Sequence, residues 1–284
     1  MPKKHNHLIY LICLMVSSIA TPALSGSGKL LATSGITQIE GSGGGGIVPW
    51  ATIAGYGSKD EISASAFYTQ VTLDDYRLNV LGANVGFYDR VELSIAKQRF
   101  DLTTLGGDIE QTVYGAKVRV YGDVIYSKWP QISLGMHHKR LSDRAIANAL
   151  GAKDSSSGTD YYIAATKVNL GLAYGYNVVW NLTGRLSKGN ELGLLGFGSS
   201  TEEDYQFLLE GSVGILLSRN WVAGIEYREK PDSLGLKEDD WFDAFVGYIP
   251  NKHFSLTLAW AKLGTIAGAK DQDGLFLTMT GKLW

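Results

Sequence analysis

The sequence predicts an all-β protein, a transmembrane antiparallel up-and-down β-barrel of about 14 strands, with 12 strands as the alternative. Stretches of roughly ten residues alternate apolar and polar side chains with a period of two, as tilted membrane strands do. Long and short connections alternate along the chain, which matches outer loops and periplasmic turns. The composition of 35 Gly against 6 Pro, with 15 Tyr and 7 Trp, suits strands, tight turns and aromatic belts. A secreted β-sandwich is the soluble alternative, but it has no reason to alternate its connection lengths.

The N-terminus has the pattern of a secretory signal peptide, which we assign to residues 1–25 and expect to be cleaved. A basic start, MPKKHNH, precedes the apolar run from Leu8 to Ala20, and small residues follow up to Ser25. The apolar run is about 13 residues long, shorter than the roughly 20 that a spanning helix needs. Cleavage would remove Cys13, the only cysteine, so the expected barrel domain, residues 26–284, would contain no disulfide.

The hairpin from Tyr76 to Phe100 has the clearest pattern. Two alternating strands flank a predicted two-residue turn at Asp89-Arg90. One face is apolar, and polar side chains such as Asn84 and Glu92 lie between its members. In a membrane barrel the apolar face meets lipid and the polar face lines the interior.

Twelve further segments complete the prediction. Most alternate as the hairpin does, and the first is weakly patterned. They are Leu30–Glu40, Ile47–Gly57, Glu61–Val71, Gln111–Tyr121, Gln131–Leu141, Tyr161–Gly171, Asn177–Ser187, Tyr205–Leu217, Trp221–Lys230, Trp241–Ile249, Phe254–Leu263 and Gly274–Trp284.

The N-terminal residues 26–46 have two possible roles. Leu30–Glu40 is either the first barrel strand or part of a plug folded inside the lumen, followed by the glycine-rich residues 41–46. Counting connections back from the C-terminus puts both ends of the barrel on the periplasmic side only if Leu30–Glu40 is a strand. This parity favours 14 strands over 12.

Charged residues on the inward faces are the candidate site. The strands from residue 111 to 187 supply a basic wall made of Lys117, Arg119, His137, Lys139, Lys167 and Arg185. The strands from residue 205 to 249 supply an acidic sector made of Glu210, Glu226 and Asp243. Opposed charges across a lumen orient and select polar solutes, as at the constriction of general porins. The structural alternative is that these charges pair with one another to satisfy a plugged interior.

We expect no catalytic residues, metal site or cofactor. The sequence has no nucleophile elbow, HExxH motif, phosphate loop or Cys/His cluster. Ser133 and His137 share a face of one strand but lie roughly 13 Å apart, too far for a nucleophile and its base. The net charge of −2 gives no indication of nucleic acid binding.

Several strings resemble a family of Gram-negative proteins known only as a domain of unknown function: GKLLATSGITQIEGSGGGG, VPWATIAGYG, YDRVELSIAKQRFDL, LLGFG and EYREKPD. The resemblance extends over nearly the whole mature chain and implies an outer-membrane location. The family has no established activity, so the resemblance implies no functional residues.

The expected function is a passive, porin-like channel for small solutes in the Gram-negative outer membrane. The expected partners are outer-membrane lipid, lipopolysaccharide and the barrel assembly machinery. Two alternatives stay open: a closed structural barrel or one that binds a ligand or partner, and a channel for hydrophobic compounds with an N-terminal plug.

Overall fold

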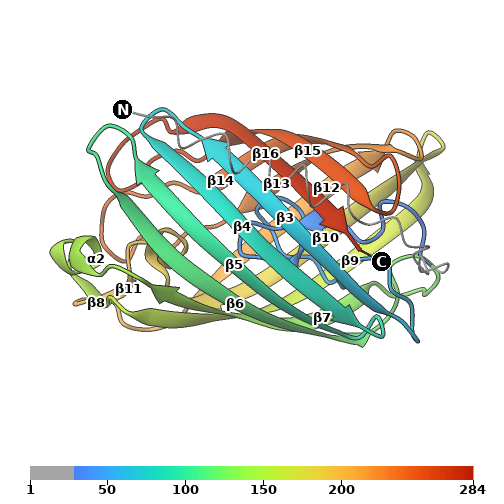
Figure 1. Cartoon of the computed structure of the whole chain (residues 1–284), viewed down its shortest axis with the longest axis horizontal. Coiled ribbons are helices and arrows are strands. Elements are labelled where there is room, and N and C mark those ends of the chain that lie inside the picture. Colours follow the sequence, from blue (N-terminus) through green and yellow to red (C-terminus); the bar gives the residue numbers. More distant parts are fainter. Residues whose placement is uncertain (1–28, 284) are drawn as a thin grey trace.

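The computed structural model describes residues 29–283, and these form a closed antiparallel barrel of 12 strands around an N-terminal segment (Figure 1). The predicted signal peptide, residues 1–25, lies outside the described residues. Each barrel strand pairs with its neighbours along the chain, and β16 closes the barrel against β3. The strands are β3 (Ile62–Thr72), β4 (Tyr76–Phe87), β5 (Val91–Leu102), β6 (Asp108–Tyr121), β7 (Gln131–Leu141), β9 (Ser157–Ala173), β10 (Tyr176–Ser187), β12 (Gln206–Leu216), β13 (Trp221–Arg228), β14 (Trp241–Tyr248), β15 (Phe254–Lys262) and β16 (Asp273–Lys282).

The strand count corrects the preference for 14 and confirms the alternative of 12. Twelve of the predicted segments correspond to the barrel strands, but Leu30–Glu40 and Ile47–Gly57 do not pair with the wall. Leu30–Glu40 contains only β1 (Ile36–Thr37), which pairs with β2 (Gly43–Gly44) from the glycine-rich residues between the two segments.

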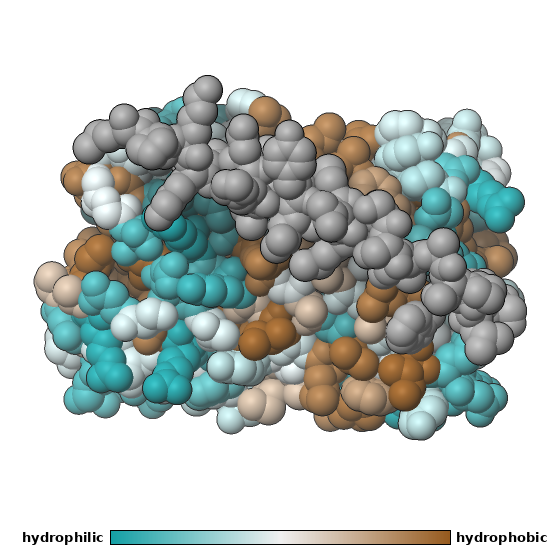
Figure 2. Space-filling view, in the orientation of Figure 1, coloured by the Kyte–Doolittle hydropathy of each residue, from teal (hydrophilic) through white to brown (hydrophobic). Residues whose placement is uncertain are grey.

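Period-two alternation determines which side chains enter the barrel. On β5, Glu92 and Gln98 are buried inside, whereas Leu93 and Ile95 are about half exposed on the outer wall. Apolar residues form patches over the middle of the visible wall, and polar residues gather towards its ends (Figure 2). None of the helices within residues 29–283 is long and apolar enough to cross a membrane.

The two ends of the barrel differ in their connections. The end with the short turns, which we call the turn end, includes residues 88–90, 174–175 and 217–220. The first of these turns has three residues rather than the predicted two, and Tyr88 and Asp89 both adopt positive φ. Residues 122–130 are the long exception at this end.

The opposite end, which we call the loop end, has most of the longer connections. Its loops include the short helix α2 (Ala145–Ala149), strands β8 (Ala152–Asp154) and β11 (Phe197–Ser199), which pair with each other, and the 3-10 turn η1 (Asn190–Gly193). Leu192, Leu194 and Leu195 are buried there. These leucines pack into the mouth of the barrel, because Leu192 and Leu194 line the same small cavity as Ile39 and Ile47 of the interior segment.

Residues 29–57, which we call the plug, lie inside the barrel. From residue 34 to residue 57 almost every side chain is buried, although only four residues are in strands. The plug both enters and leaves near the turn end, because Lys29 pairs with Asp89 at 2.6 Å and Ser58 bonds to Glu61 just before β3.

Candidate functional site

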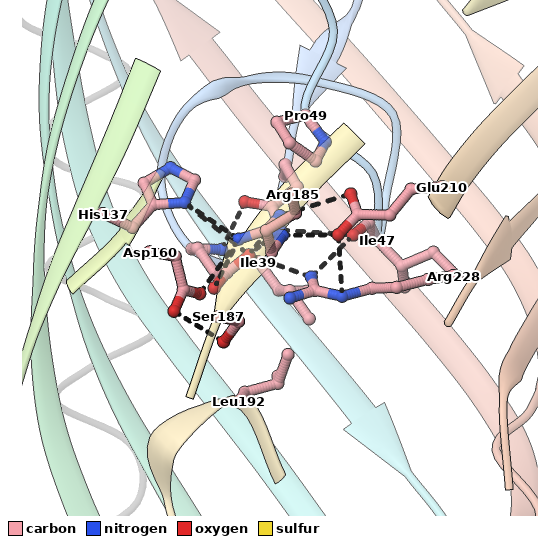
Figure 3. A network of polar contacts seen from close by, with 12 residues as sticks. Ile39, Ile47, Pro49, His137, Asp160, Arg185, Ser187, Leu192, Glu210 and Arg228 are labelled. Carbon is pink, nitrogen blue, oxygen red and sulfur yellow. Dashed lines mark hydrogen bonds and ion pairs between the residues drawn. The ribbon is translucent and has the colours of Figure 1, made fainter. Parts of the chain in front are cut away.

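The candidate site is centred on Glu40, a plug carboxylate that four barrel side chains surround. Figure 3 shows three of these side chains, His137, Arg185 and Arg228, gathered around Ile39 of the plug. The Glu40 oxygens lie 2.6 Å from Lys139 Nζ, 2.9 Å from Arg228 Nη1 and 3.2 Å from Arg185 Nη2. His137 Nδ1 is 3.8 Å away. These side chains come from β7, β10 and β13, so the barrel wall brings them together from three different strands.

Two barrel carboxylates complete the cluster. Arg185 Nε donates to Glu210 Oε1 at 2.5 Å, and Arg185 Nη1 lies 3.2 Å from Asp160 Oδ2. Lys139 Nζ also donates to Asp160, at 2.6 Å, and Ser187 Oγ donates to its other oxygen at 2.6 Å. The cluster is buried on every side, so its charges depend on one another rather than on water for stabilisation.

The cations keep Glu40 ionised. Burial alone would raise the pKa of its carboxyl, but the charges of Arg185, Arg228 and Lys139 hold the pKa well below its usual range. Gln38, also in the plug, donates to Glu40 Oε2 at 2.7 Å and accepts the Glu40 backbone N–H. The plug therefore orients the carboxylate that the wall binds.

A second contact attaches the plug backbone to the acidic sector. Glu226 accepts the N–H groups of Gly46 at 2.6 Å and Ile47 at 2.9 Å, and the hydroxyl of Ser212 at 2.6 Å. Asp243 lies directly opposite Glu226 in the strand register, and its oxygens have no hydrogen-bond partner within the described residues. Glu226 thus binds the plug through backbone donors.

A third contact lies on the other side of the lumen. Glu92 accepts the N–H groups of Gly43 at 3.0 Å and Ala54 at 2.7 Å. Lys117, 3.1 Å from Glu92, donates to the carbonyls of Gly43 at 2.8 Å and Thr52 at 2.7 Å. This buried ion pair therefore satisfies plug donors and acceptors together.

The predicted basic wall divides into two groups. Lys117, His137, Lys139 and Arg185 lie inside against the plug. Arg119 lies at the turn end, where it pairs with Asp89 and Asp123. Lys167 Nζ donates to backbone carbonyls of the turn-end residues 123–127.

The predicted acidic sector has two environments. Glu210 belongs to the Glu40 cluster, whereas Glu226 and Asp243 lie together beside the glycine-rich part of the plug. Arg228 pairs with Glu40 and Glu210. The strand pattern alone did not identify Glu40 or Asp160. Asp160 lies at an inward position of β9 in phase with Ala164 and Thr166, so the alternation of that strand could have identified it. Glu40 lies in a segment without a reliable pattern.

Other polar groups in the interior also bond to the plug. Ser133 Oγ, considered above beside His137, donates to the Ala51 carbonyl at 2.6 Å. Within residues 29–283 no group of His, Cys, Asp and Glu is arranged to hold a metal ion.

Two small cavities lie beside the plug. One cavity of about 30 Å³ lies against Trp50 and Phe245, and another of about 20 Å³ lies between Ile39 and Leu192. A larger hollow of about 900 Å³ lies at the turn end, beside Lys29 and Arg219.

The sequence matches the family described as "Protein of unknown function (DUF3034)" over residues 33–280. The chain belongs to this family. The match begins within the plug and ends in β16, so the family includes both the plug and the barrel. No curated protein matches the DUF3034 chain.

Solved structures of two porins and an outer-membrane channel resemble this chain. The KdgM porin superposes with a TM-score of 0.50 at 12% identity, over 76% of this chain and 98% of that porin. The NanC porin gives a TM-score of 0.48 at 7% identity, over 78% and 99% of the two chains. An outer-membrane channel from Pseudomonas putida F1 gives 0.39 at 12% identity, over 83% and 96%. The KdgM superposition shows that the DUF3034 chain has a porin-like fold.

Proposed function

We propose that this protein is an outer-membrane channel whose lumen is closed by the plug, and that it passes small polar solutes when the plug moves aside. The observation that supports this function best is the chemistry of the contact between plug and wall. Glu40, Glu92 and Glu226 attach the plug through ion pairs and hydrogen bonds to charged groups.

The physical reason lies in the cost of buried charge. A permanently closed barrel gains as much stability from apolar side chains as from buried ion pairs, because desolvation offsets most of the attraction between the charges. A lumen that fills with water on opening needs charged side chains on its wall and not apolar ones. The charges that pair with the plug when it is in place are hydrated when it moves aside, so opening leaves none of them unpaired in a dry interior.

The surroundings of the barrel belong to the same proposal. Leu81, Leu182 and Leu275 project from the outer wall and are more than half exposed, which supports a lipid environment. Outer-membrane lipid and lipopolysaccharide would surround this wall, and the barrel assembly machinery would insert it.

The second candidate is a permanently closed structural barrel, which the small volume of the cavities beside the plug favours. A channel for hydrophobic compounds has less support, because charged side chains line the interior beside the plug.

A disulfide between plug and wall tests the channel. The hydroxyl oxygens of Thr37 in the plug and Thr280 in β16 are 3.3 Å apart, close enough for the double variant Thr37→Cys/Thr280→Cys to form a cross-link. We expect single-channel openings in planar bilayers under reducing conditions. Oxidation should abolish most of them, and a reductant should restore them.

The matched control places the same chemistry within the wall. The hydroxyl oxygens of Thr69 and Thr278, on β3 and β16, are 2.7 Å apart, so Thr69→Cys/Thr278→Cys cross-links two strands and leaves the plug free. Its conductance should not depend on oxidation. If the wild-type protein and both reduced variants conduct no current at any voltage, the channel proposal is wrong and the protein is a permanently closed structural barrel.

A further inference from the structure

The cations around Glu40 have the arrangement of a site for a carboxylate ligand. Arg185 contacts both carboxylate oxygens, with Nη1 3.4 Å from Oε1 and Nη2 3.2 Å from Oε2. Lys139 binds the first oxygen at 2.6 Å and Arg228 the second at 2.9 Å. The planar guanidinium fork matches a carboxylate in this two-point geometry, and a lysine on one side adds a point charge.

The charge balance of the wall leaves this site one negative charge short. Lys139, Arg185 and Arg228 supply three positive charges, and Asp160 and Glu210 supply two negative ones. His137 adds no charge, because Arg185 can only donate and so His137 Nδ1 must accept in their 3.4 Å contact. Glu40 is therefore the single anion that neutralises the cluster, and it belongs to the plug rather than to the wall.

We infer that the barrel wall contains a binding site for the carboxylate of small acidic solutes, and that Glu40 occupies it as a tethered ligand while the plug is in place. This inference rests on the proposed channel function for its physiological role. When the plug moves, the wall keeps one uncompensated positive charge in a lumen open to water. A solute with one carboxylate replaces Glu40 there, and a neutral solute of the same size does not.

The site also explains how an acidic solute would favour opening. Glu40 and the solute carboxylate compete for the same cations, so a solute bound at Arg185 and Arg228 removes two of the ion pairs that hold the plug. Ligand binding to the open state shifts the population towards that state by mass action.

Chemical rescue tests the site directly. Glu40→Ala removes the tethered carboxylate and leaves its three cations without it, so propionate should bind the purified variant in detergent and raise its melting temperature. Propionamide, which has the same shape without the charge, should do neither. Calorimetric titration should give a dissociation constant for propionate at least about tenfold lower for Glu40→Ala than for the wild-type protein, in which Glu40 competes.

Two double variants separate site chemistry from net charge. Glu40→Ala/Arg228→Gln restores the charge balance of the cluster and should lose propionate binding by about tenfold or more. Glu40→Ala/Lys97→Gln has the same net charge, but Lys97 is exposed on the outer wall, where it pairs with Glu110, so binding should be retained. Equal binding in the two double variants, or binding of propionamide as strong as that of propionate, overturns the inference.

A flux measurement keeps this inference distinct from the channel function. Proteoliposomes containing Glu40→Ala should take up lactate faster than glycerol, and the preference should vanish in Glu40→Ala/Arg228→Gln. Propionate binding without flux of either solute supports the site and contradicts the channel. Equal flux of lactate and glycerol without propionate binding supports the channel and contradicts the site.

Discussion

At the scale of single residues, the close approach of the plug to the wall depends on glycine. A Cβ built on Gly45 would lie 1.6 Å from Oε1 of Glu226, the carboxylate that accepts the N–H groups of Gly46 and Ile47. Two atoms that are not bonded cannot lie so close together, so a side chain at position 45 must displace the plug backbone or the Glu226 carboxylate. The run of glycines, which the sequence presents as a spacer, is thus required by a contact with a distant strand.

Gly45→Ala should therefore loosen the plug without changing any charge. We expect a loss of about 1–3 kcal/mol in the free energy of unfolding, typical of inserting atoms into a packed interior. Faster hydrogen exchange at the amides of Gly46 and Ile47 should accompany it. Gly281→Ala in β16 is the control, because the nearest atom to its Cβ would be 4.0 Å away. Unchanged exchange in Gly45→Ala would mean that Glu226 does not hold the plug.

The sequence predicts well on which face of a strand a charged side chain lies. It predicts less well which residues that side chain contacts. Lys117, Lys139 and Arg185 lie inside as the alternation indicates, because period two determines the face of a strand. Alternation does not show where the wall meets the plug, and so Arg119, two residues after Lys117, pairs with Asp89 and Asp123 at the turn end instead of contacting the plug. Glu40 could not be found this way, because its partners come from three strands and its own segment has no strand pattern.

At the scale of elements, the strand count shows where connection parity fails. Connection parity predicts a strand at Leu30–Glu40 because an extra strand keeps both ends of the barrel on one side. A segment that enters and leaves through the same end preserves that parity without any strand, and the plug does this at the turn end. The other 12 segments are recognisable because outward and interior positions alternate along most of their length.

The loop end contains a pH-sensitive contact between loops. Glu238 Oε1 accepts the Ala267 N–H at 2.8 Å, and Lys230 Nζ lies 2.6 Å from Glu238 Oε2 and 2.9 Å from Glu191. Burial and the nearby Glu191 raise the pKa of Glu238 to about 7, against the partial opposition of Lys230. The group joins the loops around residues 191, 238 and 267.

Raising the pH should weaken this contact. Because the folded-state pKa lies above the ordinary value of 4.5, the stabilisation from Glu238 is complete below pH 4.5 and is lost as the pH rises through about 7. Hydrogen exchange at Ala267, corrected for the intrinsic rate, should therefore accelerate between about pH 5 and about pH 9. In Glu238→Gln the corrected rate should stay constant. A wild-type rate that is equally flat would rule out titration of this carboxyl in the contact.

At the scale of the whole molecule, the proposed channel has a defined orientation. The long loops around α2 and η1 gather at one end, and the short turns gather with the entry of the plug at the other (Figure 1). Outer-membrane barrels direct long loops outward and short turns to the periplasm. The hollow of about 900 Å³ beside Lys29 would then open towards the periplasm.

Cysteine labelling on intact cells tests this orientation. Leu105 at the loop end is 80% exposed and Tyr174 at the turn end is fully exposed, so both positions accept a label without disturbing the wall. A membrane-impermeant maleimide should label Leu105→Cys on intact cells, and Tyr174→Cys only after the outer membrane is permeabilised. The parent chain, whose only cysteine is Cys13, is the background control. Labelling of Tyr174→Cys alone on intact cells would mean that the barrel has the opposite orientation. Acidic solutes would then reach the Glu40 site from outside through the hollow at Lys29.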